Sequence, residues 1–213
     1  MSWALDHIDD IVSRGLQHAW LAGIPLLLGL VVAVPLGWLA TRTSWLRATL
    51  LSSTGLLYTI PSLALFILLP TILGTKILDP VNVIVAMTIY TVALLTRTVA
   101  DGLSSIDPST RQAAIAMGYG GFARFRAVDL PLALPVIAAG LRVAAVSNVS
   151  IVSVASLIGI SQLGYFLTDG YARAFPTEIW VGIVACLLLA LAFDLVIQGI
   201  ARILTPWTRA VAA

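Results

Sequence analysis

The chain has 213 residues, of which 60% are hydrophobic and only 10% are charged, and its mean hydropathy is +1.02. A soluble domain of this length could not bury so much apolar surface, so the composition excludes an ordinary soluble protein and predicts a membrane protein. The formal net charge of only +2 gives no reason to expect a nucleic-acid partner.

The N-terminal residues 1–18 are expected to form an extracytoplasmic segment. They carry Asp6, Asp9 and Asp10 where a signal peptide would carry positive charge, and no short apolar run with a cleavage site follows. The two histidines, His7 and His18, lie here, and we expect both to be solvated because no set of metal ligands lies nearby.

Five windows of the length needed to cross the hydrocarbon as helices come next, since such a span takes about 20 apolar residues. They predict an all-α polytopic membrane protein with a transmembrane region of 19–206 and a short cytoplasmic tail, 207–213. Proline removes an i to i−4 hydrogen bond, so Pro25, Pro35 and Pro61 are expected to kink their helices. The windows lie near residues 19–41, 50–73, 81–100, 132–158 and 179–203.

Five spans place the two ends of the chain on opposite sides of the membrane, and the basic residues decide which side is which. The smaller set consists of Arg14, Lys76 and Arg173. The larger set consists of Arg42, Arg47, Arg97, Arg111, Arg124, Arg126, Arg202 and Arg209. Because the larger set marks the cytoplasm, we expect the N-terminus outside and the C-terminus inside.

Residues 101–131 form a polar loop between the third and fourth windows. Asp107 and Pro108 are typical of an N-cap and a first helical position, so a short helix is expected from about 108 to 117. Gly118 suits a left-handed C-cap. One face carries, at the spacing i, i+3, i+4 and i+7, Thr110, Ala113, Ala114 and Met117. This face could dock into a groove; the alternative is an interfacial helix that merely joins two spans.

The spacing of this loop resembles the cytoplasmic coupling loop of ABC importer permeases. That family has Glu-Ala-Ala, a Gly six positions after the Glu, and Ile-x-Leu-Pro at a fixed distance. The matching residues here are Gln112, Ala113, Ala114, Gly118, Val128, Leu130 and Pro131. Val replaces the Ile, and Gln replaces the Glu, which removes a negative charge that could meet the partner. The resemblance implies that the ATPase contact includes Arg111, Gln112, Ala113, Ala114, Met117 and Gly118.

Other segments are similar to the osmoprotectant subfamily of these permeases, which imports glycine betaine, choline, carnitine and related quaternary amines. The segment 61–65, Pro-Ser-Leu-Ala-Leu, is one of them. The segment 157–164 is another, although Ile160, Ser161 and Gln162 replace the small residues usual there. The similarity extends from about Gly23 to Pro206, which is nearly the whole chain.

The resemblance implies a machine in the inner (plasma) membrane that is divided among subunits. This chain would be one permease subunit and not an enzyme, working with a second, identical or paralogous, permease subunit. Two ABC ATPase subunits would bind ATP and Mg, and an extracytoplasmic substrate-binding protein would deliver the solute. The chain itself is expected to hold no cofactor or metal, since it has no G-x-x-x-x-G-K-[ST] phosphate loop.

Candidate residues for the translocation path come from the spans. The rings of Tyr58 and Tyr90 would suit a quaternary ammonium, which is attracted by cation–π forces; the alternative is that both rings only pack. Ser147, Asn148 and Ser150 in the fourth window offer small or polar side chains to the path or, as the alternative, to helix packing.

Arg142 and Asp194 interrupt the fourth and fifth windows at similar depths. Ionised groups within the membrane usually face protein and find partners. We therefore expect a structural ion pair between these residues, with snorkelling of Arg142 or pairing of Asp194 with Arg97 as alternatives.

Two other functions stay open at this stage. The same machine could import another small solute, such as an amino acid. A self-sufficient secondary carrier or channel is the other alternative, although no inverted repeat supports it.

Overall fold

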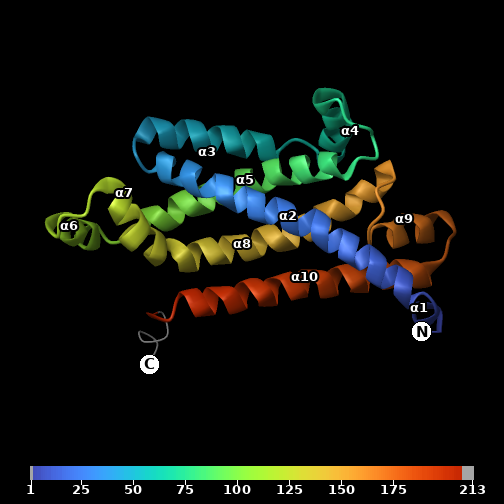
Figure 1. Ribbon diagram of the computed structural model, residues 1–213. Helices are drawn as coiled ribbons and strands as arrows, with labels where there is room; N and C mark the ends of the chain where they lie inside the picture. The colour runs from blue at the N-terminus through green and yellow to red at the C-terminus, as the bar shows by residue number, and fades with distance from the viewer. Residues whose placement is uncertain (1, 208–213) are drawn as a thin grey trace.

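The computed structural model describes residues 2–207, and all the regular secondary structure in that range is helical. The long helices lie side by side, with the N-terminus at one end of the bundle and the end of the last helix at the other (Figure 1). The predicted tail 207–213, with Arg209, lies outside the described residues except for Trp207. The elements are α1 (Ser2–Asp6), α2 (Ile8–Ala40), α3 (Ser44–Tyr58), α4 (Ser62–Leu73), α5 (Pro80–Ser104), α6 (Pro108–Ala116), α7 (Gly121–Arg124), the π-helix η1 (Phe125–Asp129), α8 (Leu130–Val152), the 3₁₀-helix η2 (Ser153–Ile158), α9 (Tyr165–Ala172) and α10 (Pro176–Leu204).

Four helical stretches among the described residues are long and apolar enough to cross a membrane, namely α2, α5, the run from α7 to η2, and α10. The count becomes five if α3 and α4 together form one broken span. Helix α2 begins at Ile8, so residues 8–18 continue the helix of the first predicted window.

The second predicted window, 50–73, is divided between α3 and α4, which are bent by 98° relative to one another. The break has a local cause. Pro61 has no N–H to donate and lies in extended backbone at the N-cap of α4. The residue before a proline is also disfavoured in the α-helical region. Helix α3 therefore ends at Tyr58, and α4 turns away from its axis.

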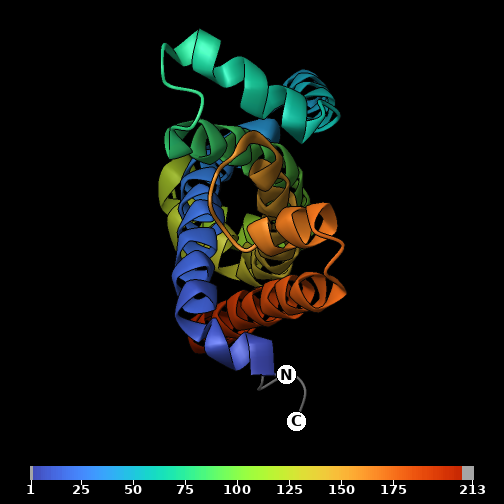
Figure 2. The ribbon, with the colours of Figure 1, turned by 90° about the vertical axis from the view of Figure 1, so that its right-hand side faces the viewer.

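Helix α5 is central to the bundle and is approached closely by its neighbours at glycines. A Cβ atom at Gly37 of α2 would lie 2.5 Å from Val99 Cγ1 of α5. Gly29 of α2 approaches Thr91 in the same way, and Gly140 of α8 approaches Thr98. Small residues permit such close backbone packing between helices in lipid, where apolar burial drives association little. Figure 2 shows α3 and α4 on one edge of the bundle and α10 on the opposite edge.

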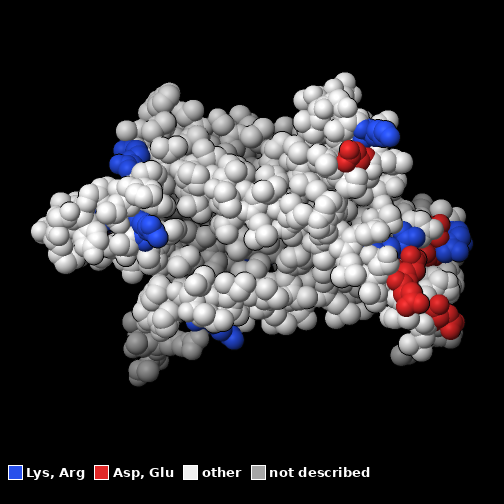
Figure 3. Space-filling model, in the orientation of Figure 1, with Lys and Arg blue, Asp and Glu red and all other residues white. Residues whose placement is uncertain are grey.

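The outside of the bundle is apolar, as a lipid-facing surface requires. Helix α10 exposes Leu187, Leu188, Leu191 and Leu195, each more than half exposed. On the face drawn in Figure 3, charged side chains gather at the two ends and leave an uncharged band between them. Only basic residues are visible at the α6 end of that face, whereas both signs occur at the α1 and α9 end.

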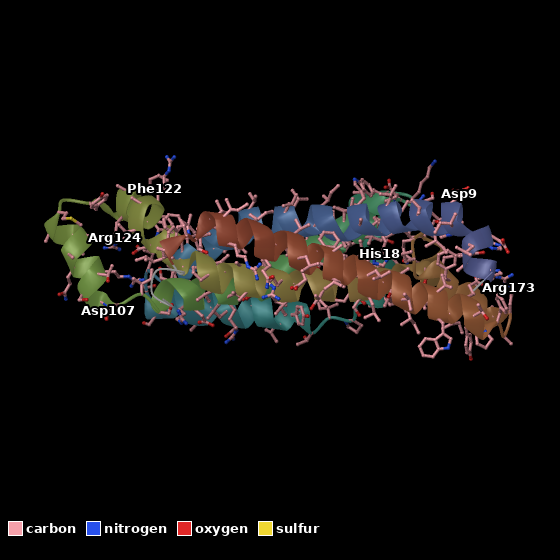
Figure 4. All side chains as sticks on the ribbon, turned by 90° about the horizontal axis from the view of Figure 1, so that it is seen from below. Asp9, His18, Asp107, Phe122, Arg124 and Arg173 are labelled. Carbon is pink, nitrogen blue, oxygen red and sulfur yellow. The ribbon has the colours of Figure 1, made fainter. Side chains whose placement is uncertain are left out.

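His18 is buried, so the prediction from the sequence that its side chain is solvated was wrong. Its side chain is fully buried, and Nε2 lies 2.9 Å from the backbone oxygen of Val149 in α8. The reason is that α2 continues through this position as a packed helix, so the ring turns into the bundle (Figure 4). His7 is exposed, with Nδ1 2.8 Å from the oxygen of Trp3.

The end of the bundle that carries α9 has its own ionic link. Arg173, between α9 and α10, pairs with Asp169 at 2.6 Å and with the buried carboxylate of Glu178. The hydrogen bond to Glu178, and the negative charges of both carboxylates, raise the pKa of Arg173. This link joins α9 to α10 across a tight turn, in which Ala174 adopts a positive φ of 51°.

Candidate coupling loop and translocation face

The polar loop contains the helix that the sequence predicts. Helix α6 spans Pro108–Ala116, and Asp107 Oδ1 accepts a hydrogen bond of 2.7 Å from the amide of Ser109 as its N-cap. Hydrogen bonds from the hydroxyl and then the amide of Ser109 lower the pKa of Asp107. The prediction of a helix from about 108 to 117 is therefore confirmed.

The end of α6 is set by Gly118, whose φ is +86°. The amide of Tyr119 donates to the oxygen of Ala114, and the amide of Gly118 donates to the oxygen of Ile115. This pair of bonds is the Schellman arrangement, in which a left-handed residue satisfies the last carbonyls of a helix. A residue with a Cβ would be strained at this position.

The residues that the sequence places on one face of α6 differ in their exposure. Gln112, Ala113, Met117 and Gly118 are exposed, and Met117 is 70% exposed. Ala114 is only 1% exposed, so it packs within its own chain and cannot touch a partner in this conformation. Its place at the ATPase contact stays a prediction from the resemblance.

Arg111 is also drawn inward, and the reason is a residue that the sequence analysis did not single out. Asp129, at the end of η1, has a side chain only 5% exposed. Arg124 Nε donates to its Oδ2 at 3.2 Å, and Arg111 Nε lies 3.7 Å from its Oδ1. Arg111 also donates to the backbone oxygen of Leu103 at the end of α5. We call these three side chains the Asp129 cluster.

The Asp129 cluster joins α5, α6, α7 and the start of α8 through one buried carboxylate. A buried charge is stable only when it is paired, and removing one member leaves an uncompensated charge. One feature of the sequence points to this cluster. Asp129 is the only acidic residue in the loop after Asp107, and three arginines lie in the same stretch. Nothing in the local spacing shows that these side chains meet.

Aromatic contacts fix the same loop to the end of α2. The ring of Trp38 lies 4.9 Å from that of Phe125 and 6.2 Å from that of Phe122, centroid to centroid. The guanidinium of Arg42 lies 4.1 Å above the Trp38 ring. Phe122, Arg124 and Asp107 all lie at this end of the molecule (Figure 4). The loop is therefore held against α2 as well as α5 and α8.

The structure brings Arg142 of α8 and Asp194 of α10 together within the bundle. Arg142 Nε lies 2.6 Å from Asp194 Oδ1, and Nη2 lies 2.9 Å from Oδ2. The pair is bidentate, the geometry in which a guanidinium and a carboxylate bind most specifically. It borders a cavity of about 430 Å³ that Ser147 also lines.

Tyr58 and Tyr90 lie together, with ring centroids 5.6 Å apart and planes at 84°. Tyr90 is buried, and its hydroxyl donates to the backbone oxygen of Ile60 at the break between α3 and α4. Tyr58 is 41% exposed and lines a second cavity of about 380 Å³. Of the two rings, Tyr58 is the one that a solute could reach.

The three polar residues of α8 have different surroundings. Ser147 lines the cavity beside the Arg142–Asp194 pair, and Ser150 is exposed on the same helix. Asn148 is buried, and its amide donates to Ala22 O at 3.2 Å and to Thr91 Oγ1 at 3.0 Å. Asn148 thus joins α8 to α2 and α5 and lines neither cavity.

A helical bundle with four or five candidate spans, small-residue packing and a capped helical loop at one end is typical of a polytopic membrane protein. Residues 33–210 match the family described as binding-protein-dependent transport system inner membrane component, and the chain belongs to that family. It is therefore a multi-pass inner-membrane permease of the ABC transporter class, a transport subunit and not an enzyme.

Two relatives with named functions are similar over most of the chain. The osmoprotectant import permease protein OsmW of Salmonella typhimurium (strain LT2) is 33% identical over 208 residues, which cover 96% of each chain. The glycine betaine/carnitine/choline transport system permease protein OpuCB of Bacillus subtilis (strain 168) is 30% identical over 190 residues, covering 89% of this chain and 86% of that one. The resemblance to the osmoprotectant permeases of this family is confirmed.

The fold is similar to that of solved importers. A chain of the MetNI methionine ABC transporter in an inward-facing conformation superposes with a TM-score of 0.81 at 22% identity, covering 92% of this chain and 96% of that one. A chain of an amino acid ABC transporter solved with histidines gives a TM-score of 0.69 at 16% identity, covering 93% and 95%. Permeases of this class work with an ATPase, which binds the nucleotide, and with a substrate-binding protein.

Proposed function

We propose that this chain is the permease subunit of an ATP-driven importer of osmoprotectant quaternary amines such as glycine betaine, choline or carnitine. The observation that carries the proposal is the 33% identity over 96% of the chain to an osmoprotectant import permease. The similarity to the methionine transporter and to the amino acid transporter lies below 25% identity and supports the fold alone.

The proposed assembly has two permease subunits, identical or paralogous, with two ATPases on one side and a binding protein on the other. We place the α6 end in the cytoplasm and the α1 end outside. Basic residues alone at the α6 end of the face in Figure 3 support this orientation under the positive-inside rule.

Coupling is proposed to pass through α6. Gln112, Ala113, Met117 and Gly118 are exposed and would meet the ATPase, while the Asp129 cluster would transmit the displacement to α5 and α8. This connection must be rigid, because a loop that deforms when the ATPase moves would not pass the movement on to the spans. The Gln at 112 would contact the ATPase without the charge of the usual family Glu.

The test is uptake by the complete system in proteoliposomes, with its own ATPase and binding protein. We expect ATP-dependent uptake of labelled glycine betaine or choline, and competition by unlabelled quaternary amines. Competition by methionine or histidine, with none by a quaternary amine, would instead show an amino acid importer. Uptake without ATP would contradict the ABC mechanism itself.

A further inference from the structure

Arg97 of α5 is a charged side chain within a predicted span that has no partner in its own chain. It is exposed, and among residues 2–207 no side chain or backbone group forms a hydrogen bond or ion pair with it. A charge within the membrane is costly unless it faces protein or water, and such residues mark solute or ion pathways. The other arginine of this membrane region, Arg142, is satisfied by Asp194.

The guanidinium of Arg97 borders the 380 Å³ cavity that Tyr58 lines. Helices α3, α5 and α8 contribute its lining. The lining residues are Thr54, Gly55, Tyr58, Ala93, Leu94, Arg97, Thr98, Gly140 and Val143. None of these described lining residues is acidic, so the cavity has one positive charge, two hydroxyls of threonine and an aromatic ring.

The chemistry of this lining is complementary to a zwitterion. A guanidinium binds a carboxylate through paired N–H donors. A quaternary ammonium has no N–H to donate, and it is attracted to the face of an aromatic ring. Arg97 and Tyr58 supply these two groups on one cavity, from adjacent helices.

We propose that this cavity is a solute site of the translocation path, in which Arg97 binds the carboxylate of a betaine-type solute and Tyr58 receives its quaternary ammonium. Arg97 is then a specificity-determining residue that favours amines with a carboxylate over choline, which has none. The inference rests on the proposed function, because it takes the solute class from there.

The experiment compares glycine betaine and choline uptake by the complete reconstituted importer, with the binding protein saturated by each solute in turn. For Arg97→Gln we expect betaine uptake to fall at least about tenfold, a factor that corresponds to about 1.4 kcal/mol. Choline uptake should fall less than about twofold. Arg97→Lys, which keeps the charge, should recover part of the betaine uptake.

Two further variants complete the set. Tyr58→Leu should reduce the uptake of both solutes, since both contain the quaternary ammonium, and Tyr58→Phe should preserve it. Lys76→Gln removes one positive charge from the exposed turn before α5 and should change neither uptake. The amount of assembled complex is measured for every variant, and uptake is expressed per assembled complex, so that a folding defect does not count as a loss of uptake.

The outcomes separate the two proposals. Wild-type uptake of neither solute overturns the proposed function and this inference with it. Wild-type uptake of choline without betaine leaves the proposed function intact and overturns the inference. Equal losses for both solutes in Arg97→Gln, or no loss for either, also overturn it and assign Arg97 to the subunit interface or to lipid.

Discussion

At the end of the bundle that carries α6, Arg111 and Arg124 both lie against the buried carboxylate of Asp129, whereas Arg97 in α5 has no partner among the described residues. The first region satisfies its charges internally and connects four elements. The second leaves a charge open to a cavity. Internal pairing suits a part that must move as one body, and an unpaired charge suits a part that binds something from outside.

Removing the carboxylate of Asp129 should have the largest effect, because it leaves Arg111 and Arg124 without the buried carboxylate that they share. We expect Asp129→Ala to lower the free energy of unfolding by about 3–5 kcal/mol, the usual cost of breaking a buried ionic cluster. Transport should be lost even where the protein survives. Thermal unfolding in detergent and ATP-driven uptake measure the two effects.

The matched control is Asp101→Ala. Asp101 pairs with Arg47 at 2.6 Å near the same end of the bundle, but its side chain is 50% exposed. Surface pairs contribute about 1 kcal/mol or less. Equal stability losses for Asp101→Ala and Asp129→Ala would show that the buried cluster does not hold the loop.

Variants of the Arg142–Asp194 pair extend the comparison of paired and unpaired charges to the interior of the bundle. We expect Arg142→Gln or Asp194→Asn alone to reduce the yield of folded protein more than the double variant does. A lone charge within a membrane span is costly, and the double variant has none. Size-exclusion profiles of detergent extracts measure the yield. A double variant worse than either single variant would give each residue a separate role.

Adjacent alanines on α6 distinguish docking from packing. Ala113 is exposed, so Ala113→Trp should obstruct the ATPase contact and uncouple ATP hydrolysis from uptake without lowering stability. Ala114 is 1% exposed, so Ala114→Leu should overpack the loop and destabilise the protein by about 1–3 kcal/mol. Parallel assays of unfolding and of ATPase binding measure both. Unimpaired uptake by Ala113→Trp would remove this face from the proposed contact.

The sequence predicts local features of these regions better than it predicts their contacts. The bounds of α6 follow from its own residues, since Asp107, Pro108 and Gly118 act within a few positions of themselves. The approach of Arg142 to Asp194 follows from depth, because two charges at one level in lipid have few other partners.

The features that sequence reasoning missed depend on long-range packing. Asp129 meets Arg111 only because α6 folds back on η1, and His18 is buried only because α2 packs against α8. The burial of Ala114 beside the exposed Ala113 has the same cause: spacing shows which residues share a side of a helix, and only the neighbouring elements decide which part of it is covered. Pro61 itself indicates a break in the helix, but the angle of 98° between α3 and α4 is set by where α4 packs.

The smallest expected effect concerns Asp107, the N-cap of α6, whose side chain is charged but exposed. Hydrogen bonds from Ser109 lower the pKa of Asp107 below its ordinary value of 3.8. A lowered folded-state pKa means that the ionised cap stabilises α6 above pH 3.8, and that this stabilisation is lost as the pH falls through the folded-state value. Hydrogen exchange of the α6 amides should therefore accelerate selectively in acid. Asp107→Asn keeps a capping oxygen that does not titrate, so its α6 exchange should lose this pH dependence. If the variant and the wild type respond to acid alike, the Asp107 cap is not the group that makes α6 sensitive to acid.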